Sequence, residues 1–277
     1  RDFTVIWNDN DTVATDPNMN CVAVLGVQGA DVRSVHASLP TGQRAFAVQT
    51  NDQDQETEDV LITRCSSDGG ISGCYISEGF VINTGKTFKN IQVVDNHFSV
   101  RLVAENAVLG PSSPIFFHGG EVPANIDVTN VIVRDNHCEG GAKGFHSSAT
   151  GVTTKFNSKV IIEGNSFEDN REHGGLIYIE DCTIENNTFD STSLQTVTVQ
   201  SAGIALYTNA QGGALSTSIR GNTFKNVSGT GAIYGILVNP NLSCSHIIDD
   251  NWFKYEDSNA PNYDVFFLDG TGVQGDV

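Results

Sequence analysis

Apolar and polar residues alternate along most of this chain in short runs, and the alternation has the two-residue period of β-strands. Runs such as "RAFAVQTN", "PIFFHGG", "GIALYTN" and "YGILVNPN" place apolar side chains at every second position, which is typical of half-buried strands. No run keeps the 3.6-residue period of a helix over ten or more residues. We therefore expect an all-β protein built from many short strands.

A second phrase recurs between these runs, and its copies align without gaps. The copies are "NIQVVDNHFS" from Asn90, "NVIVRDNHCE" from Asn130, "KVIIEGNSFE" from Lys159, "DCTIENNTFD" from Asp181, "STSIRGNTFK" from Ser216 and "SHIIDDNWFK" from Ser245, with a weaker copy, "DVLITRCSSD", from Asp59. One column of the alignment holds Asn96, Asn136, Asn165, Asn187, Asn222 and Asn251, with Cys65 in the weaker copy. Two residues later come Phe98, Cys138, Phe167, Phe189, Phe224 and Phe253. A register of this kind is the signature of a repeat protein.

The spacing of the strand-like runs indicates which repeat architecture to expect. Their starts, near Phe46, Phe80, Ile115, Phe145, Leu176, Ile204, Ile236 and Phe266, are 28 to 35 residues apart. A propeller blade needs four strands in about 40 to 45 residues, which is more than these steps hold. A coil of two or three short parallel strands fits the step, so we predict a β-solenoid of about eight coils.

These phrases resemble those of the right-handed parallel β-helix proteins of the pectate-lyase-like superfamily, over roughly Phe46 to Gly270. The resemblance implies a right-handed single-stranded parallel β-helix with an internal Asn ladder, in which side-chain amides bond the neighbouring coil. We predict this domain for residues 46–277. For residues 1–45 we expect a lead-in coil, truncated from a preceding domain or cap, because the chain does not begin with Met.

The net charge limits the binding partners to be expected, and the cysteine positions limit the metal and disulfide sites. The formal net charge of -18 disfavours nucleic acid and anionic membrane surfaces, because both would repel the protein. No run of 18 apolar residues occurs, so we expect no membrane insertion. The six cysteines lack the spacing of a zinc site. Cys65 and Cys74 alone are placed for a local disulfide, and most of the others are expected to be buried free thiols.

The resemblance leaves the function open among several classes. The superfamily includes polysaccharide lyases, glycoside hydrolases, sugar epimerases, and the trimeric tailspikes and depolymerases of bacteriophages. It implies a polysaccharide partner, an extracellular or virion-surface location and a homotrimer as one oligomeric state. We predict recognition and cleavage of an extended surface or extracellular polysaccharide by a lyase or glycoside hydrolase. The alternative is a non-catalytic glycan-binding or structural β-helix of a virion or cell-surface assembly, so enzymatic activity stays undecided.

Candidate site residues come from the strand that precedes each Asn-bearing phrase, since the resemblance implies that glycans lie along this strand. The residue after each inward pair on that strand is expected to point outward. These residues are Gln49, Asn83, His118, Glu180, Tyr207, Asn239 and Asp269, with His146 or Ser148 in the coil whose register is ambiguous. Outward positions are also polar simply because water is there, and that interpretation stays open beside the glycan site.

Acid–base chemistry selects among these positions. We predict Glu180, His118 and Tyr207 as catalytic, because their side chains can accept or donate protons. Substrate binding is assigned to Gln49, Asn83, His146, Asn239 and Asp269, together with Arg171 and Glu172 of the loop "EDNREHGG". Glu180 and Asp269 are predicted to lie three rungs apart, about 14 Å, which exceeds the separation of a glycosidase pair. A second carboxylate would have to come from a loop or another subunit.

No cofactor and no metal site are predicted from these positions. Calcium is the alternative, because many pectate lyases use it and the chain is acidic. No Asp cluster falls on successive rungs, however, and the acidic stretches "NDNDTVATD" and "NDQDQETED" lack the glycine of an EF-hand loop.

Overall fold

The structure is a computed structural model of the 277-residue chain. It describes residues 3–6, 20–39, 43–49, 56–77, 87–101, 112–119, 127–149, 159–179, 181–190, 193–194, 201–209, 212–213, 216–229, 233–239, 245–254, 263–267 and 272–273.

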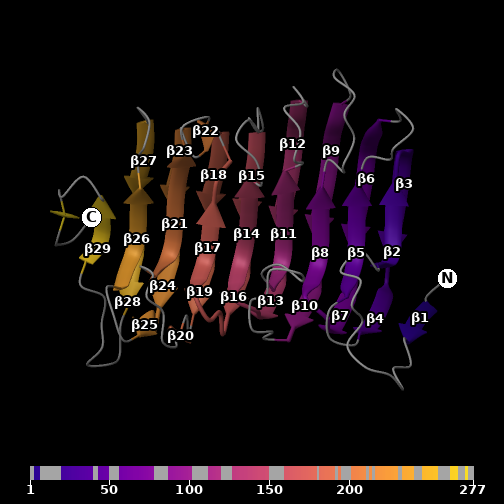
Figure 1. The fold of residues 1–277 in the computed structure, drawn as a ribbon, viewed down its shortest axis with the longest axis horizontal. Helices are drawn as coiled ribbons and strands as arrows, with labels where there is room; N and C mark the ends of the chain where they lie inside the picture. Colours follow the sequence, from indigo (N-terminus) through magenta and orange to yellow (C-terminus); the bar gives the residue numbers. More distant parts are fainter. Residues whose placement is uncertain are drawn as a thin grey trace.

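The described residues form a solenoid in which the chain passes repeatedly through three sheets, here called B, C and A in the order in which each coil visits them (Figure 1). Sheet B contains β2 (Asn20–Leu25), β5 (Arg44–Gln49), β8 (Ser72–Ser77), β11 (Ser113–Gly119), β14 (Lys143–Ala149), β17 (His173–Ile177), β21 (Ser201–Asn209), β26 (Ile233–Asn239), β29 (Tyr263–Phe267) and β30 (Gly272–Val273), with β22 (Gly212–Gly213) beside β21. Sheet C contains β3 (Gln28–Arg33), β6 (Thr57–Thr63), β9 (Thr87–Val94), β12 (Asp127–Arg134), β15 (Lys159–Glu163), β18 (Asp181–Glu185), β23 (Ser216–Arg220) and β27 (Ser245–Asp249).

Sheet A completes each coil. It contains β1 (Phe3–Ile6), β4 (Val35–Leu39), β7 (Ser66–Gly69), β10 (His97–Val100), β13 (His137–Gly140), β16 (Ser166–Glu168), β19 (Thr188–Asp190), β24 (Thr223–Lys225) and β28 (Trp252–Lys254). A short parallel pair, β20 (Ser193–Leu194) and β25 (Ser228–Gly229), lies apart from the three sheets.

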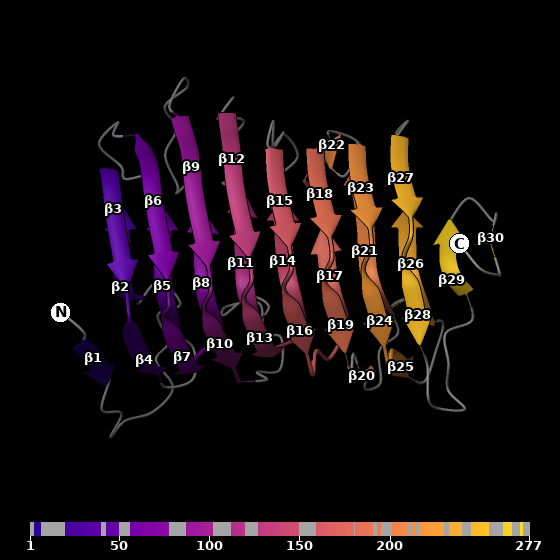
Figure 2. The ribbon, with the colours of Figure 1, turned by 180° about the vertical axis from the view of Figure 1, so that it is seen from behind.

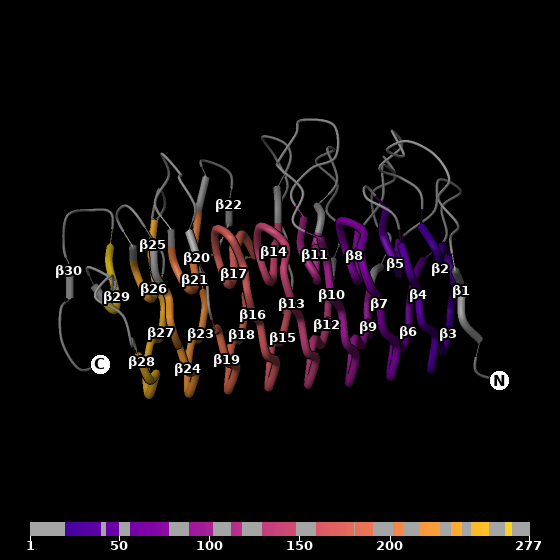
Figure 3. The backbone as a smooth tube through the Cα atoms, turned by 90° about the horizontal axis from the view of Figure 1, so that it is seen from below, coloured from indigo at the N-terminus to yellow at the C-terminus, as the bar shows by residue number. Residues whose placement is uncertain are grey.

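Successive coils pair in parallel and in register. Figure 2 shows the strands of sheet C following one another in chain order, and Figure 3 shows β1 and β29 at opposite ends of the stack. Sheet C has eight strands in the part of the chain that the structure describes, so the predicted parallel β-helix of about eight coils is confirmed. Strands β2, β3 and β4, which fall within the predicted lead-in segment 1–45, already pair in the three sheets.

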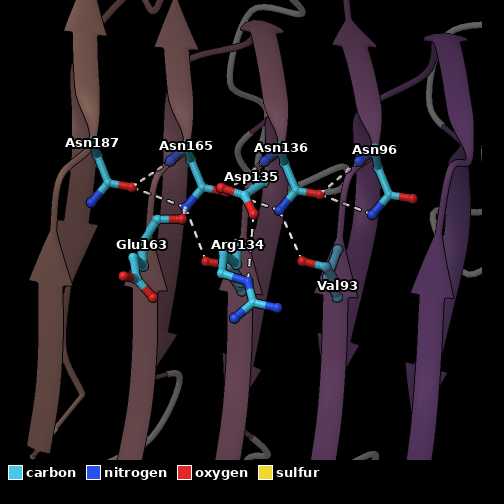
Figure 4. Close-up of polar contacts among 9 residues, drawn as sticks. Val93, Asn96, Arg134, Asp135, Asn136, Glu163, Asn165 and Asn187 are labelled. Carbon is cyan, nitrogen blue, oxygen red and sulfur yellow. Dashed lines mark hydrogen bonds and ion pairs between the residues drawn. The ribbon is translucent and has the colours of Figure 1, made fainter.

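The predicted Asn ladder is present and runs along the turns from sheet C to sheet A (Figure 4). Asn165 donates from Nδ2 to Oδ1 of Asn187 at 2.9 Å and to the carbonyl oxygen of Val133 at 2.9 Å. Its own Oδ1 accepts from the backbone N–H and Nδ2 of Asn136. The ladder ends at Cys65, whose backbone N–H donates to Oδ1 of Asn96 at 2.9 Å.

The residue before each ladder asparagine explains why the turn forms there. These residues have φ between 53° and 67° and are Asp95, Asp135, Gly164, Asn186, Gly221 and Asp250. Asp, Asn and Gly tolerate this left-handed conformation better than other residues. The turn therefore depends on the residue before the ladder asparagine as well as on the asparagine itself.

The second column of the repeat fills the core. Phe189 stacks on Phe167 and on Phe224 with ring centroids 5.2 Å apart in each case, and Phe224 stacks on Phe253 at 4.9 Å. In each of these coils the ring packs against a glycine in the sheet B strand of the same coil. A Cβ on Gly174 would come within 2.5 Å of Phe189. A Cβ would likewise come within 2.9 Å of the ring in the pairs Gly73 and Phe98, Gly144 and Phe167, Gly203 and Phe224, and Gly235 and Phe253. Large and small residues are thus matched coil by coil.

The predicted disulfide is wrong. Cys65 and Cys74 are both free thiols, as are Cys21, Cys138 and Cys182. Cys65 lies in the turn from sheet C to sheet A and Cys74 lies in sheet B, and both side chains are buried in the same core as separate thiols. Burial raises the pKa of both thiols, which keeps them protonated. Cys244 lies outside the described residues.

Among the described residues, no helix is long and apolar enough to cross a membrane.

Candidate functional site

The outer face of sheet B carries its own layer of apolar side chains. Alternate side chains of these strands point into the core. On the opposite face, Ala47, Tyr75 and Phe116 form one cluster. A second cluster there contains Leu176, Ala202, Ala205, Tyr234 and Leu237, with Tyr178, Tyr207 and Phe266 packed against it. Solvent-facing strands would carry polar residues at these positions. The outer face of sheet B is therefore built differently from those of sheets A and C.

Backbone register identifies the residues that share the predicted row. Gln49 pairs with Ser77, Ser77 with His118, and His118 with Ser148. Further along the helix, Tyr207 pairs with Asn239. The register thus places Gln49, His118, Tyr207 and Asn239 on one row, as predicted, and gives Ser148 rather than His146 as the member from β14.

Asn83 lies outside the described residues, and Ser77 of β8 occupies the rung of this row between Gln49 and His118. The sequence predicted a strand at "GFVINTG", which lies outside the described residues, whereas the strand of this coil is β8. The signal that marks β8 is a turn: Gly69 and Gly70 have φ of 88° and 73°, like Gly140 and Gly141 at 76° and 79°. "DGGISGCYIS" therefore corresponds to "EGGAKGFHSS", and Ser77 takes the rung assigned to Asn83.

Glu180 and Asp269 lie outside the described residues, and the register that placed them in the row is wrong. Gly175 pairs with Ile204 and Ile177 with Leu206, so Tyr178 stands opposite Tyr207. The sequence pattern counted only apolar side chains as inward, so it did not identify Gly175 as an inward residue.

On β29 the inward residues are Val265 and Phe267, which pair with Ile236 and Val238. The predicted inward pair, Phe266 and Leu268, is displaced by one residue, so the predicted place of Asp269 is displaced too.

His146 lies on the outer face of sheet B but is 5% exposed. Its ring stacks on Phe116 at 4.7 Å with an interplanar angle of 13°, and its backbone pairs with Leu176. His146 therefore belongs to the apolar layer of this face.

The loop "EDNREHGG" turns the corner from sheet A to sheet B. Glu172 forms an ion pair with Lys143 at 2.8 Å, and the side chains are 20% and 7% exposed. Burial, and then the charge of Lys143, lowers the pKa of the adjacent His173 to about 3. The backbone N–H of Ala202 donates to Nδ1 of His173. His173 is thus neutral at physiological pH, and Glu172 is engaged with a lysine instead of facing a substrate alone.

Arg171, the other residue of this loop assigned to substrate, is held through its backbone, whose N–H donates to the carbonyl oxygen of Gly141 at 3.1 Å. Its side chain is partly exposed.

Tyr178 and Tyr207 form a pair of aromatic side chains with polar hydroxyls on this face. Their rings stack at 5.6 Å with an interplanar angle of 25°. Both side chains are half-buried, and burial raises the pKa of both phenols. The phenols therefore keep their protons and can donate hydrogen bonds. Tyr178 was missed by the sequence prediction, and the glycine at position 175 is the signal that would have found it.

The predicted catalytic residues do not converge in the described part of the chain. Three coil steps separate His118 from Tyr207 along the row, which corresponds to about 14 Å. Two coils, with Ser148 and Tyr178 at the same position, therefore lie between His118 and Tyr207 on this row. Among the described residues, the group with metal-ligand geometry is His97, His137 and Glu139 on sheet A, on a different face from this row.

Comparisons with known proteins bear on the fold. A family model described as "Right handed beta helix region" matches residues 102–253. No curated protein matches the chain.

Among solved structures, the chain is similar to mutants of the tailspike protein of E. coli bacteriophage HK620 in complex with a pentasaccharide. Two of them have 11% and 12% identity with TM-scores of 0.36 and 0.37. The alignments cover 99% of this chain and 58% of each tailspike chain.

Proposed function

The chain belongs to the right-handed β-helix family, and from that premise we propose that it binds an extended polysaccharide along the outer face of sheet B. The observation that carries the proposal is the row in which Tyr178 and Tyr207 stack on adjacent coils and Asn239 follows on the next. Aromatic rings offer an apolar surface to sugar rings, while phenol and amide groups hydrogen-bond hydroxyls.

The dimensions and charge of this row fit a chain-like ligand. From Gln49 to Asn239 the row crosses six coil steps, about 29 Å. Tyr178, Tyr207 and Asn239 are uncharged, and the net charge of the protein is -18. A neutral polysaccharide is therefore favoured over a strongly anionic one. Such a ligand fits a protein that works outside the cell or on a virion surface, as a monomer or as a homotrimer.

Replacing either tyrosine with alanine is expected to weaken polysaccharide binding. Loss of one stacking surface should reduce the affinity about tenfold for Tyr178→Ala and for Tyr207→Ala. The measurement is titration of the polysaccharide that binds best in a panel of capsular, algal and plant glycans. Trp252→Ala is the control, since Trp252 is an aromatic residue on sheet A with 68% exposure and should leave the affinity unchanged. Absence of binding by the natural protein to every glycan would contradict the proposal.

Cleavage of the bound polysaccharide is the second candidate function, and the place of the Tyr207 phenol between Tyr178 and Asn239 on the proposed binding row favours it. A phenol that keeps its proton beside bound sugar can act as general acid. Tyr207→Phe is expected to lower the release of reducing or unsaturated ends about 100-fold or more while the polysaccharide still binds.

Two further variants sharpen the test of cleavage. Trp252→Phe is the control, since Trp252 is an exposed aromatic residue on sheet A, and it should keep the rate. Glu180→Gln tests the predicted catalytic carboxylate, and unchanged release would remove Glu180 from the mechanism. If the natural protein binds but releases no new ends, the protein is a glycan-binding module.

A further inference from the structure

Sheet A presents two histidines and two glutamates side by side on its outer face. His97 on β10 pairs directly with His137 on β13, and Glu139 pairs with Glu168 on β16. Glu139 follows His137 by two residues, so both side chains point to the same side of the strand. Parallel pairing in register therefore brings together residues that are far apart in the sequence.

We propose that His97, His137 and Glu139 form a binding site for a divalent transition metal of the zinc class. Their ligand atoms all lie within 4.8 Å of one another. The Nε2 atom of His137 is 2.6 Å from Oε1 of Glu139, and Nε2 of His97 is 3.6 Å from the same oxygen. Ligands of tetrahedral zinc, bound at about 2.0 to 2.1 Å, lie roughly 3.4 Å apart. The two distances bracket this spacing, so small side-chain rotations suffice to bind the ion.

The imidazole nitrogens decide the class of metal. Two histidines and one carboxylate suit zinc and its neighbours, whereas calcium and magnesium prefer oxygen ligands alone. Three protein ligands leave the fourth tetrahedral position to water or to an exogenous ligand.

Glu168 supplies a second and independent feature of a metal site. Its Oε1 lies 3.7 Å from Nδ1 of His137, on the side of the ring opposite the proposed metal. The hydroxyl of Ser166 donates to the same oxygen at 2.6 Å and holds it in place. If rotation of the His137 ring on metal binding shortens this distance to that of a hydrogen bond, the carboxylate would fix the orientation of the ring and raise its basicity.

The strands hold these side chains in place while leaving them accessible. Phe98, Cys138 and Phe167, which alternate with the proposed ligands, are fully buried in the core. The side chains of His97 and His137 are 54% and 39% exposed. Sites built on rigid strands lose little freedom when the ion binds. The net charge of -18 also draws cations toward the protein.

The test is titration of chelator-treated protein with Zn²⁺, followed by calorimetry, and with Co²⁺, followed by its visible absorption. The natural protein is expected to bind Zn²⁺ and to melt at higher temperature when the ion is present. His97→Gln, His137→Gln and Glu139→Gln should each weaken binding by about 100-fold and remove the tetrahedral Co²⁺ spectrum. Glu168→Gln should weaken binding about 10- to 100-fold while a tetrahedral spectrum remains.

His36→Gln is the matched control, because His36 is also an exposed histidine on sheet A and its Nδ1 lies 2.8 Å from the hydroxyl of Ser66. This variant should bind Zn²⁺ like the natural protein. Circular dichroism establishes that each variant is folded, and the three ligand variants are read independently, so one unfolded variant leaves two tests. Zn²⁺ binding of unchanged affinity and stoichiometry in the folded ligand variants would overturn the proposal, as would the absence of binding tighter than about 1 mM by the natural protein.

Discussion

Asn165→Ala is expected to lower the free energy of unfolding by about 3 to 5 kcal/mol. The substitution removes the amide that accepts two hydrogen bonds from Asn136 and donates to Val133 and Asn187. Asn165 is 2% exposed, so water cannot readily replace these partners. Each buried polar group left without a partner costs about 1 to 3 kcal/mol. The measurement is urea denaturation followed by circular dichroism.

Asn251→Ala makes the same substitution at another rung, so comparing the two losses of stability shows the effect of position in the ladder. Asn251 is the last rung among the described residues and is 7% exposed. It accepts from Asn222 and donates to the carbonyl oxygens of Ile219 and Asp249. Asn251 is more exposed than Asn165, so water can replace its partners more readily, and we expect a smaller loss than for Asn165→Ala. Equal losses, or a loss below about 1 kcal/mol for Asn165→Ala, would show that the ladder does not stabilise the coils as argued.

The parallel stacking explains why much of the fold was predictable. In a solenoid whose coils pair in register, a repeat in the sequence becomes a column in space, so alignment alone places Asn165 beside Asn136 and Phe189 beside Phe167. No tertiary information is needed for these contacts, because the neighbour in space is the equivalent residue of the next coil. The same logic gave the correct row for Gln49, His118, Tyr207 and Asn239.

The errors arise where a small residue occupies a core position. Gly175 points into the core opposite Ile204, and a pattern of apolar side chains passes over it, which displaced the row to Glu180. In the coil of β8 the same preference selected "GFVINTG" over the less apolar "SGCYIS". The glycine turns, with their positive φ, mark the start of these strands better than apolar side chains do.

The proposed metal ligands were missed for a different reason. His97 and His137 are 40 residues apart, and no local spacing rule joins them. Both occupy the position directly after a ladder asparagine, in "DNHFS" and "DNHCE". Reading the aligned copies by column for ligand residues, in addition to core residues, would have placed the two imidazoles on adjacent rungs.

Phe189→Ala is expected to destabilise the protein by about 3 to 5 kcal/mol. Its ring lies between Phe167 and Phe224 and is 1% exposed. Truncation removes contacts on both ring faces and leaves a cavity that neighbouring coils cannot fill, because their backbones are fixed by strand pairing on both sides. Thermal and urea denaturation both measure the loss.

Two further variants test whether lost packing in the phenylalanine stack causes the destabilisation by Phe189→Ala. Phe189→Leu keeps much of the side-chain volume and should cost about 1 to 2 kcal/mol. Phe253→Ala removes the last ring of the described stack, which is only partly buried, so its loss should be smaller than that of Phe189→Ala. If all three variants lose the same stability, the stacked interior is not what distinguishes Phe189. A graded series would show instead that the ring volume buried between neighbouring coils sets how much each position of the stack stabilises the helix.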